Sequence, residues 1–427
     1  MLASRLPWIG VDYGADPDSY RVVNAARQIA ASGRYIESRL PGYPVHEYAS
    51  ALLVPAGPLA SNLATAVLSV VAALFVALIL ERWGVRESIP AAAAFALTPV
   101  VYVNSTCSID YVWAIAFVLG ALYFALLGRP YLAGALLGLG TGCRLTSAAM
   151  ILPLGLLLLV QGPPERRRSD LARFAVATGM VGAACFAPVW LRHGWSFFTF
   201  RELSSYPNLT HVIERATTGV WGTVGTIAWL LAGPLAFLSA RRAGGALREA
   251  PRRSAFLLCV TVVALYGAAY ARLPLDAGYL VPVVPFAIMA LGLVAPSRVF
   301  RVFCLALCFS PFIDVGRKGI TLGGPLAADR VARLQDDRGA RAVIEAASQL
   351  PEQVVVVCGS MQPRILSMIV AGPSAERFLY LIDDAAVLEP DAGGGEPVRF
   401  VPGADLENLA LNGIDLRALG AEEIRPR

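Results

Sequence analysis

Charge is scarce in this chain, and that scarcity limits what the protein can be. Only 16% of its 427 residues are Asp, Glu, Lys or Arg, whereas 56% are hydrophobic and the mean hydropathy is +0.59. A soluble domain carries about 25% charged residues. Several windows of about 18 or more residues hold no charge, which is long enough to span a bilayer. The composition therefore excludes an ordinary soluble protein and predicts a polytopic α-helical membrane protein.

Familiar binding motifs are missing as well. The seven cysteines include no CxxC pair, and most lie in or beside apolar segments, so neither a disulfide framework nor a metal cluster is indicated. No Gly-rich phosphate loop follows a strand, which argues against a nucleotide site. The net charge of +5 reflects arginines clustered at helix ends and does not indicate nucleic-acid binding. Residues 1–10 neither span nor form a signal peptide, so we expect a missing first helix or an outside N-terminus.

Residues 1–316 are predicted to form a membrane domain with a first outer loop at 10–58 and about ten transmembrane helices. The hydrophobic segments cover residues 59–81, 88–105, 109–127, 130–143, 146–161, 171–191, 217–240, 254–271, 279–296 and 300–315. If the segments alternate in direction, most arginines between them fall on one side, which the positive-inside rule makes cytoplasmic. The charge-rich first loop and the chain after Asp314 are then expected on the opposite side.

The composition changes after residue 316. Ala327 to Leu350 reads as a charged amphipathic helix, and three short apolar runs are typical of buried strands. These runs are Val354–Cys358, Phe378–Ile382 and Arg399–Val401, with helices expected at Asp383–Leu388 and Leu406–Asn412. We predict that residues 317–427 form a small soluble α/β domain on the non-cytoplasmic side.

The candidate acids and bases lie in or near the first outer loop. Asp16-Pro17-Asp18 is a helix start, with Asp at the N-cap and Pro at the first helical position. A carboxylate at the lip of a membrane cavity can accept a proton from a hydroxyl, and we favour Asp18 for this role. Asp16 is expected either to cap the helix or to act as the base. Asp110 is either the N-cap of an apolar helix or a second carboxylate that positions an acceptor or a metal.

Several further side chains are candidates for binding a substrate. Arg144 lies between two apolar segments, where an unpaired charge is expensive and is usually functional. Arg272 lies in an outward turn, and Arg192 ends a segment on the same side. Arginines there can clamp a phosphate, or can simply reach the membrane interface. His46 and Glu47 follow a rigid PGYP turn and either orient a substrate or begin a surface helix.

These features together resemble the GT-C superfamily of membrane glycosyltransferases, and in particular the dolichyl-phosphate-mannose-type protein mannosyltransferases and their bacterial relatives. The similar parts are the DPDSYR segment, SRLPGYPVHEY, Asp110, the GALLGLGTGCRLTSA run with Arg144, and the turn before YLVPVVPF, which begins at Tyr279. The resemblance covers residues 10 to 295. It implies a base at Asp18 or Asp16, and substrate contacts that include Tyr279. Gly278 departs from the pattern, because relatives often have Arg there.

The resemblance implies a hexosyltransferase that moves a sugar, with inversion, from a polyprenyl-phosphate-linked donor to a hydroxyl on the non-cytoplasmic side. The acceptor is expected to be a glycolipid, a glycan or a protein, and the location a bacterial inner membrane. No cofactor is required by the sequence, and a divalent metal stays open. The alternatives are a non-enzymatic carrier or lipid flippase, and a scaffold without catalysis. The carrier is disfavoured because no internal repeat is found and the polar groups gather at one face.

Overall fold

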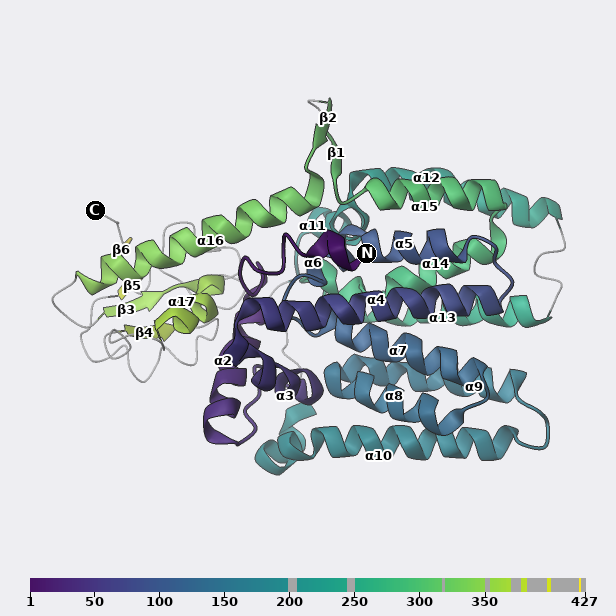
Figure 1. Cartoon of the computed structure of the whole chain (residues 1–427), viewed down its shortest axis with the longest axis horizontal. Helices are drawn as coiled ribbons and strands as arrows, with labels where there is room; N and C mark the ends of the chain where they lie inside the picture. The colour runs from purple at the N-terminus through teal and green to yellow at the C-terminus, as the bar shows by residue number, and fades with distance from the viewer. Residues whose placement is uncertain are drawn as a thin grey trace.

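The structure of the chain is a computed structural model that describes residues 1–198, 206–243, 250–316, 319–349, 354–369, 378–381, 398–400 and 422–423. Long helices lie side by side along one axis, and a smaller domain projects beyond one end of this bundle (Figure 1). The bundle is held together by one large core of buried apolar side chains that draws on nearly all of its helices. The predicted fold class, a polytopic helical membrane protein with a small C-terminal α/β domain, is confirmed.

Apolar helices occupy each of the hydrophobic segments that the sequence predicts, with a pair of short helices in the second. They are α4 (Pro58–Arg82), α5 (Ser88–Leu97), α6 (Pro99–Asn104), α7 (Tyr111–Leu126), α8 (Pro130–Cys143), α9 (Ile151–Gln161), α10 (Arg167–His193), α12 (Thr218–Ala243), α13 (Ala250–Arg272), α14 (Val283–Val294) and α15 (Ser297–Phe309). Helix α12 bends at Gly222, where the backbone is not helical.

Four helices of the described chain are long and apolar enough to cross a membrane by length and composition: Pro58–Arg82, Arg167–Phe198, Thr218–Ser239 and Pro251–Arg272. The other apolar helices of the bundle are shorter. Many of their outward side chains are nevertheless large and apolar, such as Leu152 and Leu156 on α9 and Val302 on α15. A surface of this kind is stable in lipid rather than in water. The number of crossings, about ten, therefore stays a prediction.

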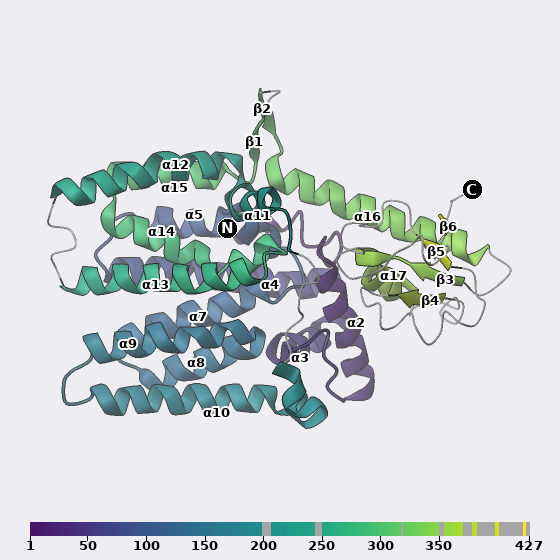
Figure 2. The ribbon, with the colours of Figure 1, turned by 180° about the vertical axis from the view of Figure 1, so that it is seen from behind.

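The connections between helices fall into two groups at opposite ends of the bundle (Figure 2). The connections between α4 and α5, α7 and α8, and α9 and α10 contain Arg86, Arg129 and Arg166, and they lie at one end together with the start of α15, which contains Arg298. The first loop and the C-terminal domain lie at the other. This arrangement agrees with segments that alternate in direction. The end with the first loop and the C-terminal domain is the polar end of the bundle.

Two short helices cover the polar end of the bundle. Helix α2 (Pro17–Ser32) begins at Asp16, whose carboxylate accepts a hydrogen bond from the Asp18 backbone N–H, and ends at Gly33 with a left-handed φ of 67°. The start is as the sequence predicts, and glycine is the residue that most readily adopts the left-handed conformation at a helix end. Helix α3 (Pro44–Leu53) follows the PGYP turn. Helix α1 (Leu2–Arg5) and α11 (Leu209–Ala216) lie at the same end.

The C-terminal domain contains a parallel sheet of strand order β4-β3-β5-β6. Its strands are β3 (Val354–Val357), β4 (Phe378–Leu381), β5 (Val398–Phe400) and β6 (Glu422–Glu423), and its helices are α16 (Gly324–Ser348) and α17 (Gln362–Ile369). The predicted strands and the amphipathic helix are therefore present. The helices expected at 383–388 and 406–412 lie outside the described residues. An antiparallel hairpin that the sequence did not predict, β1 (Ile313–Gly316) with β2 (Gly319–Leu322), precedes α16.

Candidate functional site

A cavity of about 760 Å³ opens at the polar end of the bundle. Its wall combines segments that are far apart in sequence: the start of α2, the turn before α3, the residues after α8, helix α11, the turn before α14 and two helices of the C-terminal domain. The residues that carry charge in this wall are Asp16, Asp18, Arg21, Arg39, Arg144, Arg215, Asp276, Asp336 and Arg364. This concentration of charge in one concave site beside apolar helices makes it the candidate site.

Asp110 lies behind the cavity wall and binds two arginines of that wall. Its side chain is fully buried and makes no capping hydrogen bond to α7. Instead one carboxylate oxygen lies 3.1 Å from Arg39 and the other lies 2.6 Å from Arg144. Burial alone would raise the pKa of Asp110, but the two guanidinium groups outweigh it and lower the pKa below its usual range. Asp110 is therefore ionised, and it fixes Arg39 and Arg144 in the cavity wall.

Aromatic rings pack against the guanidinium groups of these two arginines. The guanidinium carbon of Arg39 lies 4.1 Å from the ring centre of Tyr43, and that of Arg144 lies 4.2 Å from the ring centre of Tyr111 and 5.1 Å from that of Tyr279. Rings at this distance hold a guanidinium by cation–π attraction. The Nη1 atom of Arg39 is buried and has no hydrogen-bond partner among the residues that the structure describes. It therefore has an unused donor for an anion.

The two aspartates at the start of α2 have different surroundings. Asp18 lies 2.9 Å from Arg21 and 3.0 Å from Arg39, so its charge is compensated by two ion pairs. Asp16 accepts a hydrogen bond from the backbone of Asp18 and makes no ion pair within the described chain. Burial, and after it the neighbouring Asp18 and Asp276, raise the pKa of Asp16 well above its usual value. Asp16 is therefore more basic than an ordinary aspartate.

The turn before α14 closes the cavity next to Tyr111. Asp276 accepts a hydrogen bond from the Tyr111 hydroxyl at 2.9 Å and caps the following turn through the Gly278 N–H at 3.1 Å. A Cβ atom at Gly278 would lie 2.7 Å from the Tyr111 ring, so no side chain fits at this position. This contact explains the departure from the family pattern: the space beside the turn is filled by Tyr111, against which Arg144 already packs.

Four of the predicted substrate-binding residues lie outside the cavity wall. Arg272 is exposed, and Arg192 is exposed and forms an ion pair with Glu37 at 3.2 Å. His46 is buried edge-on against Trp113, and burial lowers its pKa to about 4, so it is neutral. Glu47 is fully buried. The structure thus brings Asp16, Asp18, Arg144 and Tyr279 together, with Asp110 behind them.

Glu47 accepts several hydrogen bonds from the loop that contains Arg39. Its carboxylate accepts hydrogen bonds from the Tyr35 hydroxyl, from the Ser38 N–H at 2.6 Å and from the Tyr43 N–H at 3.0 Å. These partners lie on both sides of Arg39 in the sequence. Glu47 therefore fixes the course of the loop and, through it, the direction of the Arg39 side chain.

Sequence reasoning missed part of the cavity wall. Arg39 is one of several arginines in the first loop, and nothing in the local sequence separates it or its neighbour Tyr43 from the rest. The cavity wall also contains residues that the sequence does not predict for the site, namely His211 and Arg215 of α11 and Asp336, Met361 and Arg364 of the C-terminal domain. No local pattern marks the latter group, because only the packing of α11 and of the C-terminal domain brings them to the cavity. Within the described residues no group of three or more His, Cys, Asp or Glu side chains is placed to hold a metal ion.

Two solved structures of ArnT from Cupriavidus metallidurans have a similar fold, one in the apo state and one bound to undecaprenyl phosphate. Their TM-scores are 0.60 and 0.59, and in each case 14% of the aligned residues are identical. The match covers 99% of this chain and 88% of the ArnT chain. No family model matches the chain, and no curated protein matches it in sequence. The likeness shows the fold alone: this chain folds as ArnT does, which agrees with the resemblance at that level.

Proposed function

We propose that the chain is a membrane glycosyltransferase that transfers a sugar from a polyprenyl-phosphate-linked donor to a hydroxyl group. The observation that carries this proposal is that Asp16 and Asp18 line the same cavity as Arg39 and Arg144. A carboxylate can accept a proton there, and the two guanidinium groups can hold a phosphate. ArnT shares the fold and is bound to undecaprenyl phosphate in one of its structures, which supports a polyprenyl-phosphate ligand here.

Arg39 and Arg144 are assigned to the leaving group. As the bond between the anomeric carbon and the phosphate oxygen breaks, negative charge develops on the phosphate, and preformed cations stabilise that charge. Asp110 holds both arginines in place before the donor binds, so little reorganisation is needed. Tyr279, which packs on Arg144, borders the same part of the cavity.

Asp16 is assigned the role of base. The acceptor hydroxyl gives its proton to Asp16 while its oxygen attacks the anomeric carbon. A base works best when its pKa is close to the working pH, and the raised pKa of Asp16 moves it in that direction. The sequence favoured Asp18. Because Asp18 already binds Arg21 and Arg39, we assign it to holding Arg39 instead.

The finer points of the reaction follow from this arrangement. A single displacement, with the hydroxyl attacking opposite the phosphate, inverts the configuration at the anomeric carbon. We place the reaction on the non-cytoplasmic side, because the connections that contain Arg86, Arg129 and Arg166 lie at the end of the bundle opposite the cavity. The bound donor tail belongs in lipid beside the helices, with hexoses such as mannose as the first donors to test and a glycolipid, glycan or protein as the acceptor.

The proposal is tested with purified protein in lipid nanodiscs, a panel of polyprenyl-phosphate hexoses and hydroxyl acceptors. Release of polyprenyl phosphate and formation of the glycoside are measured for Asp16→Asn, for Asp18→Asn and for the control Asp170→Asn, whose carboxylate pairs with Arg173 away from the cavity. Loss of a general base typically costs roughly 10²–10⁴-fold in rate. We expect a loss of this size for Asp16→Asn without a loss of folding, because Asn also caps helices well.

The pH profile separates the two aspartates. Asp16 accepts a proton only when it is ionised, so the rate of the unmodified protein should fall as the pH drops below the raised pKa of this carboxyl. Asp16→Asn should lose this acidic limb, and Asp18→Asn should keep it. If Asp18→Asn alone abolishes transfer, the base is Asp18. If neither variant changes transfer, the carboxylate mechanism fails, and a carrier that moves the lipid without chemistry becomes the better hypothesis.

A further inference from the structure

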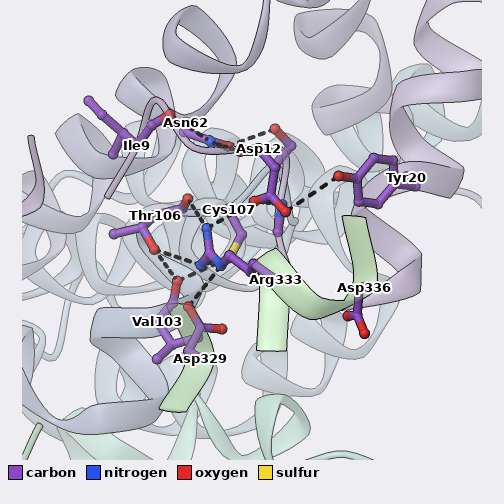
Figure 3. Close-up of polar contacts among 12 residues, drawn as sticks. Ile9, Asp12, Tyr20, Asn62, Val103, Thr106, Cys107, Asp329, Arg333 and Asp336 are labelled. Carbon is purple, nitrogen blue, oxygen red and sulfur yellow. Dashed lines mark hydrogen bonds and ion pairs between the residues drawn. The ribbon is translucent and has the colours of Figure 1, made fainter. Parts of the chain in front are cut away.

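Asp12, four residues before Asp16, is bound by two arginines of the C-terminal domain. Its side chain is only 9% exposed. Arg333 of α16 lies 3.4 Å from one carboxylate oxygen (Figure 3), and Arg364 of α17 lies 3.0 Å from the other. The two arginine side chains are 2% and 4% exposed. Charges buried this deeply are stable only in pairs, so the contact joins the C-terminal domain firmly to the first loop.

Arg364 holds this segment at more than one point. Its second terminal nitrogen donates to the Gly14 carbonyl at 2.8 Å, and its guanidinium carbon lies 4.5 Å from the ring centre of Tyr20. Gly14 has a φ of +143°, and a Cβ atom there would lie 2.7 Å from the Ser19 hydroxyl. The chain between Asp12 and Tyr20 is therefore tightly enclosed, and one side chain from the C-terminal domain contacts its beginning, its middle and its end.

The two helices of the domain are also fixed around this segment. On α2, the Asn24 side chain donates to the Pro363 carbonyl at 2.9 Å, and Arg27 donates to the Ser367 carbonyl at 2.6 Å. On the other side, Arg333 donates to the Thr106 carbonyl at 3.3 Å and contacts the Cys107 sulfur at 2.9 Å. The domain thus binds α2 on one side and the loop before α7 on the other, and the Asp12 segment lies between these contacts.

We propose that the C-terminal domain is a working part of the transfer site, with Arg364 and Arg333 as positioning residues for the segment that carries Asp16 and Asp18. This inference rests on the proposed function. Asp336, Met361 and Arg364 line the same cavity as the two aspartates, so the domain also forms part of its wall. Residues after 316 therefore set the geometry of a reaction whose other groups belong to the membrane domain.

The membrane domain and the C-terminal domain each contact the segment from Asp12 to Tyr20, so removing Arg364 should remove only part of its support. The membrane domain holds the same segment through Asn62, which donates to the Asp12 carbonyl at 2.6 Å, and through the Tyr13 carbonyl, which accepts from the Ser108 N–H at 2.8 Å. Without Arg364 the segment should stay in place but lose its exact direction. A misplacement of about 1 Å can cost on the order of 10²-fold in rate. Donor binding should persist, because Asp110, which lies outside this segment, still binds both Arg39 and Arg144.

The experiment compares Arg364→Ala, Arg333→Ala and Asp12→Asn with the control Arg341→Ala, an arginine of α16 that is 72% exposed and pairs with Asp337. Hydrogen–deuterium exchange of the full chain in nanodiscs reports on residues 12–20, and steady-state kinetics gives kcat and the donor KM. We expect faster exchange in this segment and a kcat lowered by on the order of 10²-fold, with the donor KM within about twofold of the unmodified value. Arg364→Lys should restore part of the rate, and Arg341→Ala should change nothing.

Exchange and kinetics decide different questions. Unchanged exchange at residues 12–20 in folded Arg364→Ala and Asp12→Asn would overturn the positioning role, whatever the protein catalyses. Faster exchange with an unchanged kcat would overturn the link to the reaction. A raised donor KM with an unchanged kcat would do the same and would make the domain a donor-binding element. The unmodified protein could transfer no sugar while Asp12→Asn still exchanges faster at residues 12–20. The proposed function would then fail, but the C-terminal domain would still be shown to hold the first loop in place.

Discussion

Asp110 is fully buried and yet ionised, because a guanidinium group approaches each of its carboxylate oxygens. The sequence left two roles open for it, a helix cap and a second carboxylate of the site. Asp110 stands at the N-cap position of α7, but its side chain makes no capping hydrogen bond, so capping does not account for its carboxylate. As a second carboxylate of the site, Asp110 acts indirectly: it does not line the cavity but binds Arg39 and Arg144, which do.

We therefore expect Asp110→Asn to weaken donor binding rather than to remove a base. The amide cannot compensate both guanidinium charges, so Arg39 and Arg144 should repel each other and turn away. The donor KM should rise by at least about tenfold, which corresponds to about 1.4 kcal/mol. Unsatisfied charged groups should also lower the free energy of unfolding by about 1–3 kcal/mol. Kinetics and denaturant titration in nanodiscs measure the two effects.

Arg144→Lys serves as the partner variant. Lys keeps the charge but not the planar fork that binds Asp110 and a phosphate together, so the donor KM should rise with little loss of stability. Asp170→Asn, at an ion pair away from the cavity, is the control and should leave the donor KM unchanged. Normal donor use by both Asp110→Asn and Arg144→Lys would exclude the phosphate role of this cluster.

At the scale of elements, the glycines of helix α8 allow this helix to pack closely against α10 and α7. The Gly-rich run in residues 134–142 predicts close helix approach. Gly134, Gly138 and Gly142 face α10, where a Cβ at Gly138 would lie 2.7 Å from the Val181 Cβ and one at Gly142 would lie 2.8 Å from the Cys185 Cβ. Gly140 faces α7, where a Cβ would lie 3.3 Å from the Phe117 Cβ. Arg144 follows directly after this helix, so its packing sets where the guanidinium lies.

We expect Gly138→Ala to destabilise the protein although alanine is the better helix former by about 1 kcal/mol. The added methyl group has no room against Val181, and overpacking typically costs roughly 1–3 kcal/mol. Gly179→Ala on α10 is the matched control, because nothing lies within 4 Å of its Cβ position; it should leave stability unchanged or raise it. Thermal unfolding in detergent compares the two. Equal stability of both variants would contradict the close approach of α8 and α10.

At the scale of the whole molecule, the two ends of the bundle are chemically different. The candidate cavity and the C-terminal domain share one end, and the connections that contain Arg86, Arg129 and Arg166 share the other. Because positively charged connections stay in the cytoplasm, we expect the cavity to face the opposite side. This orientation decides which substrates can reach it.

Cysteine labelling measures the orientation. Glu165→Cys, in the exposed connection between α9 and α10, should react with a membrane-impermeant maleimide only after the membrane is opened. Ser348→Cys, exposed at the end of α16, should react in intact cells. Native cysteines within the described helices are mostly buried, and a variant without added cysteine corrects for the rest. Labelling of both positions from the same side would contradict the predicted topology and the one-sided site.

The sequence by itself determined the features that depend on neighbouring residues. Apolar segments of bilayer length, the Asp16-Pro17 helix start, the Gly33 end, the close-packing glycines of α8 and the strands of the C-terminal domain all follow from local composition and spacing. The family resemblance added Tyr279 to the candidate site residues, whereas composition and spacing marked Asp16, Asp18, Asp110 and Arg144. Each of these was conspicuous because a charge or a motif residue stood beside an apolar segment, where solvation makes it costly.

Only the tertiary structure decided which of these groups meet. The ion pair between Asp110 and Arg144 joins residues 34 apart, that between Arg39 and Asp110 joins residues 71 apart, and that between Arg364 and Asp12 joins residues 352 apart. Such contacts depend on how helices pack, and packing is a property of many side chains at once rather than of any short pattern. For the same reason the sequence suggested Arg272 and Arg192, which share the polar end of the bundle but not the cavity, and gave no sign of Arg364.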